Sequence, residues 1–270
     1  MKILLNNSAL NEALYDVSSL GFIPTMGCLH KGHISLIKRS LKECDKTIVS
    51  IFVNPTQFNN KTDFKRYPRN NMKDLSILKK LKIDFLYQPN VKDVYYSKTN
   101  SLTRLNKKDK ILCAKYRKGH FEGVIDVMSR LTKVIKPKKI YMGEKDFQQL
   151  HLVKRFIEKN YKSKIIACKT IRNANKLALS SRHSLLTKAD LAVAGKLSKN
   201  LISLKRKLVR FKDIRKMIIK KKKELIKFYS IKVEYLELRN TFNLKNTNKI
   251  KNSKLFIAYY INKIRLIDNF

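Results

Sequence analysis

The stretch that most constrains this chain is residues 21–36, where an apolar run leads into a glycine-containing turn and then into apolar residues at helical spacing. We interpret it as a strand, a phosphate-binding turn and the start of a helix. Gly27 and Gly32 can adopt backbone angles that are closed to other residues, and they let a ligand approach the main chain. His30 and His33 lie three residues apart at the mouth of the turn. The stretch therefore predicts a site for the phosphates of a nucleotide.

Strands and helices are expected to alternate through roughly the first 170 residues. The predicted strands are 22–25, 47–53, 84–87, 139–142 and 165–169, and the predicted helices are 8–17, 34–44, 72–81, 121–135 and 147–160. This alternation indicates an α/β protein with a parallel sheet and right-handed crossovers, whose ligands bind at the carboxyl ends of the strands. Residues 91–118 have no clean period and are expected to form an irregular excursion over the sheet edge.

The character of the chain changes after about Arg172. Two segments with helical spacing, 187–207 and 213–228, are followed by three short β-type runs at 232–238, 255–261 and 264–267. Helices followed by strands indicate a smaller α+β domain. We therefore predict a division into residues 1–174 and 175–270, in the loop that precedes the sequence Leu-Ala-Leu-Ser-Ser-Arg.

The turn His30-Lys31-Gly32-His33 carries the most specific chemistry. Adenylyl transfer requires a site that holds a triphosphate and stabilises charge on the oxygen of the leaving pyrophosphate. A helix N-terminus supplies N–H donors and the positive end of a dipole, and imidazoles add donors that can be protonated near neutral pH. A metal site is the competing interpretation, but the sequence lacks the Glu of H-E-x-x-H and an evident third ligand, so no metal ligand is assigned.

The formal net charge of +41 by itself suggests a nucleic-acid or anionic-membrane partner. The lysines are spread along the whole chain beside abundant Asn and Ile, which favours a general drift in composition over a dedicated patch. The densest run, 220–223, lies in a helical pattern with apolar residues at 211, 214, 218, 225 and 228 and is expected to be a solvated helix face.

Other features of composition point to a cytoplasmic protein. No apolar run approaches the roughly 20 residues needed to cross a bilayer, and the first residues do not read as a signal peptide. The four cysteines are scattered without a C-x-x-C pair, so reduced thiols are expected. With 43% apolar residues the chain can build a substantial core.

Seven blocks of sequence carry a resemblance to a known family. They are Pro-Thr-Met-Gly-x-Leu-His-x-Gly-His at 24–33 and the segments 49–58, 66–69, 119–124, 143–149, 177–182 and 265–269. In this order, over almost the whole chain, they resemble pantothenate synthetases, the AMP-forming ligases that join pantoate to β-alanine. The H-x-G-H element alone is less specific, because class I tRNA synthetases and small nucleotidyltransferases share it. The resemblance implies a Rossmann-like parallel sheet of the class I H-x-G-H nucleotidyltransferase type, with a smaller C-terminal α+β lid domain.

The resemblance also implies which residues bind ATP. His33 would be a catalytic acid or charge stabiliser with His30 as its companion, Lys145 would contact the phosphates, and Asp146 would contact the ribose hydroxyls. The implied catalytic residues are His33, His30, Lys145 and Arg182. The implied ATP-binding residues are Met26, Gly27, Cys28, Leu29, His30, Lys31, Gly32, His33, Gly143, Glu144, Lys145, Asp146, Ile171, Leu179, Ser180, Ser181 and Arg182.

Gln57 and Gln149 would hold pantoate or β-alanine, because an amide offers both donors and acceptors to hydroxyls and a carboxylate. Asn54, Tyr67 and His120 would support the pocket. Two departures from the family pattern are evident. Asn175-Lys176 and His183 stand where the family has Asp-Gly and Asn, which puts the mobility of that loop in question, and Lys118 replaces a proline.

The implied reaction uses ATP with Mg²⁺, makes a pantoyl adenylate, and belongs to pantothenate and coenzyme A biosynthesis. A homodimer is implied as well, with no specific nucleic-acid partner and no membrane. Two alternatives stay open at this point. One is another H-x-G-H nucleotidyltransferase, which would leave the nucleotide on its product, and the other is an RNA-binding protein that reuses the fold. Against the second, no aromatic-basic RNA-binding signature is found.

Overall fold

A computed structural model describes residues 1–96 and 104–270. The chain divides into two compact units, Met1–Lys169 and Thr170–Phe270. This division falls slightly before the predicted one, and the assignment of separate functions to residues 1–174 and 175–270 stays a prediction. The part of the expected excursion at 97–103 lies outside the described residues. Its flanks contain only short helices.

The first unit is built on a six-stranded sheet with the strand order β1-β4-β3-β2-β5-β6, and every neighbouring pair is parallel. The predicted α/β fold with a parallel sheet is therefore confirmed. The strands are β1 (Lys2–Leu4), β2 (Leu20–Thr25), β3 (Lys46–Ile51), β4 (Phe85–Tyr87), β5 (Lys139–Gly143) and β6 (Lys164–Cys168). The α-helices are α1 (Asn7–Ala13), α2 (Lys31–Glu43), α3 (Lys61–Arg66), α4 (Asn71–Lys80), α5 (Val91–Val94), α6 (Cys113–Tyr116), α7 (His120–Ile135) and α8 (Phe147–Asn160). Single 3₁₀ turns are η1 (Pro55–Gln57), η2 (Lys107–Asp109) and η3 (Glu144–Asp146).

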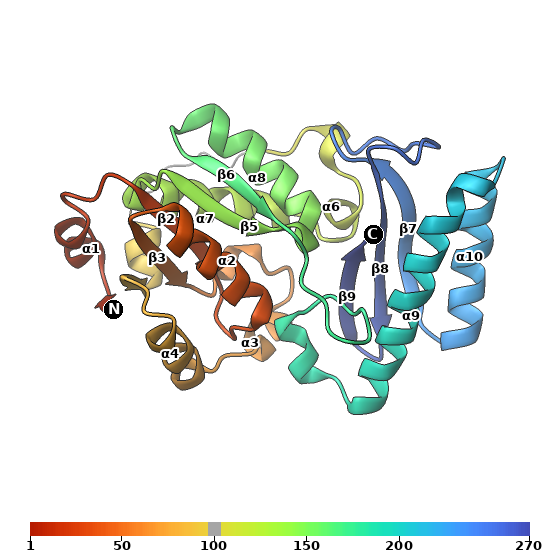
Figure 1. Cartoon of the computed structure of the whole chain (residues 1–270), viewed down its shortest axis with the longest axis horizontal. Coiled ribbons are helices and arrows are strands. Elements are labelled where there is room, and N and C mark those ends of the chain that lie inside the picture. Colours follow the sequence, from red (N-terminus) through yellow and green to blue (C-terminus); the bar gives the residue numbers. More distant parts are fainter. Residues whose placement is uncertain (97–103) are drawn as a thin grey trace. The chain divides into compact units, whose positions relative to one another are not determined.

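Helices cover both faces of this sheet, with α2 and α4 on one side and α7 and α8 on the other (Figure 1). The alternation of side chains along each strand explains why both faces are apolar. Phe22 of β2 packs with the α7 and α8 side, whereas its neighbour Ile23 packs with α2 and α4. A sheet buried on both faces needs continuous apolar strands, and the sequence supplies them.

The second unit is a three-stranded antiparallel sheet, β7-β8-β9, packed against two long helices. Its elements are the 3₁₀ turns η4 (Ser181–Leu185) and η5 (Leu208–Arg210), the helices α9 (Lys188–Lys207) and α10 (Ile214–Tyr229), and the strands β7 (Lys232–Asn240), β8 (Ser253–Ile261) and β9 (Ile264–Asn269). The predicted smaller α+β domain is confirmed. Leu197 and Leu201 of α9 and Ile218 of α10 line its core.

Three details differ from the expectations. The edge strand β1 and the short helix α3 were not predicted, because a run of three to six residues is too short to display a period. In α10, Ile214, Ile218 and Leu225 are buried as expected. Phe211 and Phe228, expected on the same apolar face, are instead 36% and 77% exposed. Phe211 precedes α10 and Phe228 lies in its last turn, so both lie outside the span from Ile214 to Leu225 that holds the buried residues.

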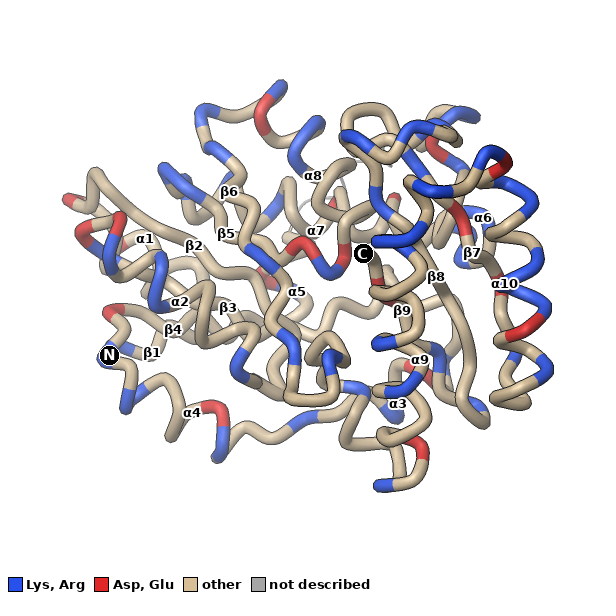
Figure 2. The backbone as a smooth tube through the Cα atoms, turned by 45° about the vertical axis from the view of Figure 1, so that its right-hand side comes forward, with Lys and Arg blue, Asp and Glu red and all other residues tan. Residues whose placement is uncertain are grey.

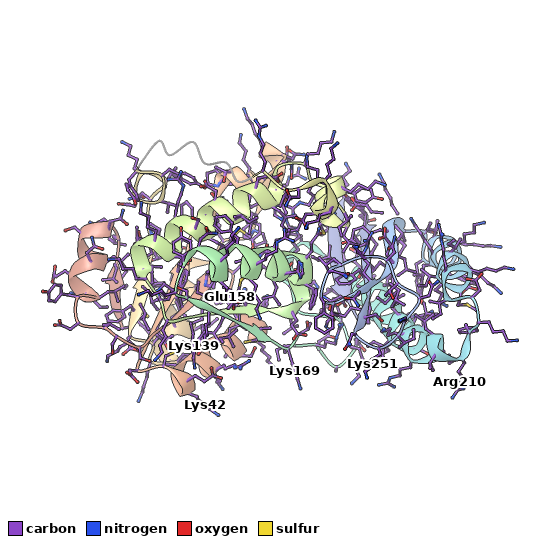
Figure 3. The ribbon with its side chains drawn as sticks, turned by 90° about the horizontal axis from the view of Figure 1, so that it is seen from above. Lys42, Lys139, Glu158, Lys169, Arg210 and Lys251 are labelled. Atoms are coloured by element: carbon purple, nitrogen blue, oxygen red, sulfur yellow. The ribbon has the colours of Figure 1, made fainter. Side chains whose placement is uncertain are left out.

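Basic residues are distributed over the whole backbone, and acidic residues are sparse (Figure 2). Exposed side chains such as Lys42, Lys169 and Arg210 project outward from their own elements (Figure 3). Within the predicted solvated run, Lys221 pairs with Glu224 at 2.9 Å and Lys222 donates to the carbonyl oxygen of Glu234. Across residues 1–96 and 104–270, every helix is too short or too polar to traverse a lipid bilayer.

Candidate active site

The candidate site lies where the order of the parallel strands reverses direction. The chain proceeds from β2 through β3 to β4 on one side, then returns to place β5 and β6 on the other side of β2. The carboxyl ends of β2 and β5 therefore flank a switch point, which is where ligands bind in open α/β sheets. The segment 26–33 follows β2 and the segment 144–146 follows β5, so the topology brings these two predicted ATP-binding segments to one edge.

Two side chains accept hydrogen bonds from the backbone of the loop that follows β2. The hydroxyl of Thr25 accepts from the N–H of Gly27 at 3.1 Å. The carboxylate of Asp74, in the first turn of α4, accepts from the N–H of Cys28 and from that of Leu29, both at 2.7 Å. Gly27 and Cys28 are both in the left-handed region, with φ of 79° and 52°. These bonds fix a backbone conformation that a free loop would rarely adopt.

Asp74 is only 1% exposed, so its carboxylate is committed to this loop. A Cβ on Gly27 would lie 3.0 Å from an oxygen of Asp74 and 3.2 Å from Ile51, which explains the need for glycine there. Asp74 was missed by sequence reasoning. It follows the Arg-Tyr-Pro-Arg block at 66–69 by only a few residues, but nothing in the local pattern marks it as the partner of a loop 46 positions away.

His30 and His33 form a reciprocal cap at the start of α2. The Nδ1 of His30 accepts from the N–H of Gly32 at 3.1 Å, and the Nδ1 of His33 accepts from the N–H of His30 at 3.3 Å. Their rings stack with centroids 4.1 Å apart. Because each Nδ1 accepts a hydrogen bond, each neutral imidazole must carry its proton on Nε2. Both rings therefore keep an Nε2–H donor that is not used by the cap.

Burial favours the neutral form of both imidazoles at pH 7. Burial lowers the pKa of His30 to about 4, with a further contribution from the charge of Lys145. Burial lowers the pKa of His33 to about 3, and the charges of His30 and Lys145 add to it. The expectation of protonation near neutral pH is therefore wrong. Because the charge of Lys145 acts on both imidazoles, its ammonium lies close to both rings. The same ammonium lies 3.7 Å from a carboxylate oxygen of Asp146.

Gln57, predicted to bind substrate, closes η1 just beyond the end of β3 and is 8% exposed. Its side-chain Nε2 lies 2.8 Å from the sulfur of Met26, which joins it to the loop after β2. The main-chain carbonyl oxygen of Gln57 accepts from Nδ1 of His120 at 2.7 Å. That tautomer is set because Arg117 donates to Nε2 of the same ring at 2.8 Å. The predicted supporting role of His120 thus has a structural basis.

Asn54 and the close approach of α7 complete this support. The Asn54 amide donates to the carbonyl oxygen of Gly123 at 3.2 Å, and its oxygen accepts from the Tyr95 hydroxyl at 2.8 Å. A Cβ on Gly123 would lie 2.6 Å from the carbonyl oxygen of Thr56, so only glycine allows this contact. Tyr67 is also buried, with its ring edge-on to Phe58 at 5.6 Å between centroids.

Gln149 lies in the first turn of α8, after β5, and is half-buried. Its neighbour Gln148 has a different task. The Gln148 side chain accepts from the N–H of Cys113 at 3.0 Å and donates to the carbonyl oxygen of Ile111 at 2.8 Å. Gln148 therefore anchors the segment before α6 to the start of α8. Sequence reasoning assigned a role to Gln149 alone and missed the anchoring role of Gln148.

The remaining predicted ATP residues belong to the second unit. Ile171 and Leu179 are paired, because the N–H of Leu179 donates to the carbonyl oxygen of Ile171 at 3.0 Å. Ser180 caps η4 by accepting from the N–H of Arg182 at 3.3 Å, and Ser181 and Arg182 form its first turn. Lys176, which stands where the family has glycine, adopts a φ of 65°, so the structure keeps the left-handed geometry without the glycine.

Comparisons with known proteins show which family the chain belongs to. The family model described as pantoate-beta-alanine ligase matches residues 2–270. The chain belongs to the pantoate-beta-alanine ligase family. A pantothenate synthetase of Flavobacterium psychrophilum is 40% identical over 266 residues, covering 96% of this chain and 94% of that protein.

Solved structures of the family also match the fold of the chain. The pantoate-beta-alanine ligase of Thermus thermophilus matches with a TM-score of 0.93 at 29% identity, covering 100% of this chain and 99% of that one. The enzyme from Francisella tularensis, solved with beta-gamma ATP and beta-alanine, matches with a TM-score of 0.81 at 37% identity, covering 100% and 97%. The family is an ATP-dependent ligase family, and the predicted membership is confirmed.

Proposed function

We propose that this chain catalyses the ATP-dependent condensation of (R)-pantoate with β-alanine, giving pantothenate, AMP and pyrophosphate. In the first step a pantoate carboxylate oxygen attacks the α-phosphorus of ATP, the bond to the bridging oxygen breaks, and pyrophosphate leaves. In the second step the amine nitrogen of β-alanine attacks the activated carbonyl carbon, loses a proton, and displaces AMP. Family membership supports this assignment.

The proposal rests on one observation. Lys145 lies close to the imidazoles of His30 and His33, at the carboxyl ends of β2 and β5. A lysine cation and two Nε2–H donors at a helix N-terminus suit a triphosphate whose bridging oxygen gains charge in the transition state. Neutral imidazoles can donate hydrogen bonds at pH 7 without first being protonated. As the phosphates approach, their negative charge would raise both pKa values and strengthen these donors.

Each remaining side chain is assigned a role suited to its chemistry. We assign His33 to stabilise charge on the leaving oxygen, with His30 beside it, and Asp146 to accept from the ribose hydroxyls. Gln57 and Gln149, which follow β3 and β5, are assigned to the pantoate hydroxyls and carboxylate. Ser180, Ser181 and Arg182 are assigned to the triphosphate, where a guanidinium can bind two phosphate oxygens at once.

Mg²⁺ is proposed to enter as Mg–ATP, coordinated by phosphate oxygens and water, as is usual for this ion. Across residues 1–96 and 104–270, no group of three or more His, Cys, Asp or Glu side chains is placed to hold a metal ion. The donors assigned to the phosphates are the imidazole Nε2–H groups and the Lys145 ammonium, which suit phosphate oxygens and not a metal ion. A homodimer in the cytoplasm is proposed from the family resemblance, and light scattering after size-exclusion chromatography would test the dimer.

Isotope exchange tests the function directly. With pantoate and Mg–ATP, labelled pyrophosphate should enter ATP, and adding β-alanine should release AMP and pantothenate together. Absence of pantoate-dependent exchange would refute the ligase assignment. A nucleotidyltransferase would instead leave the nucleotide on its product. The His33→Ala variant should keep the circular dichroism of the wild type and lose at least about a hundredfold in kcat.

A further inference from the structure

The block at 265–269 is prominent in the sequence, yet the proposed function gives it no task. In the structure it forms β9, and its Asp268 is 4% exposed and pairs with Arg172. We propose that Arg172 and Asp268 are positioning residues, which hold the segment leading to Ser180, Ser181 and Arg182 in the conformation that binds a triphosphate. This inference rests on the proposed function, because it takes those three residues as ATP ligands.

The guanidinium of Arg172 makes four hydrogen bonds at once. Two go to the Asp268 carboxylate, at 2.7 and 2.9 Å, in the side-by-side arrangement that an arginine fork favours. A third goes to the carbonyl oxygen of Asn269 at 2.9 Å, and the fourth goes to the carbonyl oxygen of Lys176 at 2.9 Å. The group also lies over the ring of Phe270, 4.7 Å from its centroid. Arg172 therefore ties a turn to the last strand.

The turn held in this way is short and internally bonded. The N–H of Lys176 donates to the carbonyl oxygen of Asn173 at 2.9 Å, and the N–H of Leu177 donates to the Asn173 side chain at 3.0 Å. A bridge between Arg172 and Ala178 then sends the chain back along itself. Ser180 follows two residues later. In Figure 1 this segment runs beside β9, against which η4 packs.

The hydrogen bond from Arg172 to the carbonyl oxygen of Lys176 matters because of the backbone conformation of Lys176. With a φ of 65°, it occupies a left-handed conformation that a lysine adopts at a cost. Capture of its carbonyl oxygen by Arg172 holds the residue there. This clamp, formed by Arg172 and Asp268, thus offsets the backbone strain at Lys176, four residues before Ser180.

Removing one partner would leave the other charge buried and unpaired, which is far more costly than losing an exposed pair. A loosened turn would leave Ser180 to Arg182 in the binding conformation for only part of the time. The apparent affinity for ATP falls by that same fraction, whereas the chemistry of molecules that have bound is unchanged. The clamp therefore predicts a rise in KM for ATP with little change in kcat.

The test uses full-length Asp268→Asn and Arg172→Lys variants. Arg172→Lys keeps the charge but offers a single ammonium in place of the fork, so it serves as the milder change if Asp268→Asn folds poorly. The matched control is Glu234→Gln. Glu234 of β7 also has a carboxylate with little exposure, 2.6 Å from Arg265 of β9, and that pair joins β7 to β9.

We expect both clamp variants to raise KM for ATP by about tenfold, with kcat and the KM for pantoate within about twofold of wild type. Hydrogen exchange should quicken at the amides of Lys176, Leu177 and Leu179 in the clamp variants without substrate, but not in Glu234→Gln. An unchanged KM for ATP, or an equal rise in Glu234→Gln, would overturn the inference. Failure of the proposed function is distinguishable, because wild type would then show no pantoate-dependent exchange, while the amide measurement would still report on the clamp.

Discussion

Replacing Asp74 with asparagine is expected to release the loop that precedes His30. In the wild type both carboxylate oxygens accept from backbone N–H groups, one from Cys28 and one from Leu29, at 2.7 Å each. An asparagine side chain has one acceptor oxygen and one amino group. Its amino group would face a second N–H donor, so one of the two hydrogen bonds must be lost.

The size of the effect follows from the burial of Asp74. A hydrogen bond to a charged group contributes about 1.5 to 3 kcal/mol, and removing a buried charge recovers part of its desolvation cost. We therefore expect a net loss of about 2 kcal/mol in the free energy of unfolding. If ATP binding must restore the loop geometry, the same free energy raises KM for ATP by up to about 30-fold.

The assay pairs steady-state kinetics with denaturant unfolding of Asp74→Asn and of a control, Asp84→Asn. Asp84 also accepts from a backbone N–H, that of Thr47 at 2.9 Å, but it does so at the amino end of β3, away from the candidate site. The control should lose stability without any change in KM for ATP. This comparison separates a local loss of loop geometry from a general loss of stability.

One result would refute the reasoning plainly. If Asp74 acted mainly through its negative charge, removing that charge would favour the approach of the phosphates, and KM for ATP would fall. A fall in KM for ATP, or no change in it despite a loss of stability, would mean that the carboxylate does not hold the loop for catalysis.

Two further predictions concern the histidine pair and the contact of Gly123 with η1. NMR titration of the ligand-free protein should give midpoints near pH 4 for His30 and near pH 3 for His33, and a midpoint of either near 6.5 would contradict the burial argument. Because unfolded histidines titrate near 6.5, their contribution to stability should be complete above that pH and lost as the pH falls toward 3 to 4. Gly123→Ala should push Thr56 and Gln57 outward and raise KM for pantoate about tenfold, as overpacking of a tight backbone contact predicts, while KM for ATP stays unchanged. Equal changes in both KM values would point to a general disturbance instead.

The sequence by itself determined the family and the longer helices and strands. Apolar periodicity and turn glycines are local properties, so the strand, turn and helix at 21–36 could be predicted without any knowledge of neighbours in space. The ordered blocks then predicted an ATP-binding loop at 26–33 and site residues at Gln57, Lys145 and the segment 180–182. Those assignments need only residue type and position along the chain.

Tertiary structure decided what holds these residues in place. Asp74 contacts the loop from 46 positions away, and Asp268 meets Arg172 from 96 positions away, and no local period encodes either pairing. The protonation state of His30 and His33 depends on burial and on the charge of Lys145, which the parallel pairing of β2 with β5 brings to the same edge of the sheet. Pairings and burial arise only when the chain is folded, because they depend on distances in space rather than along the sequence.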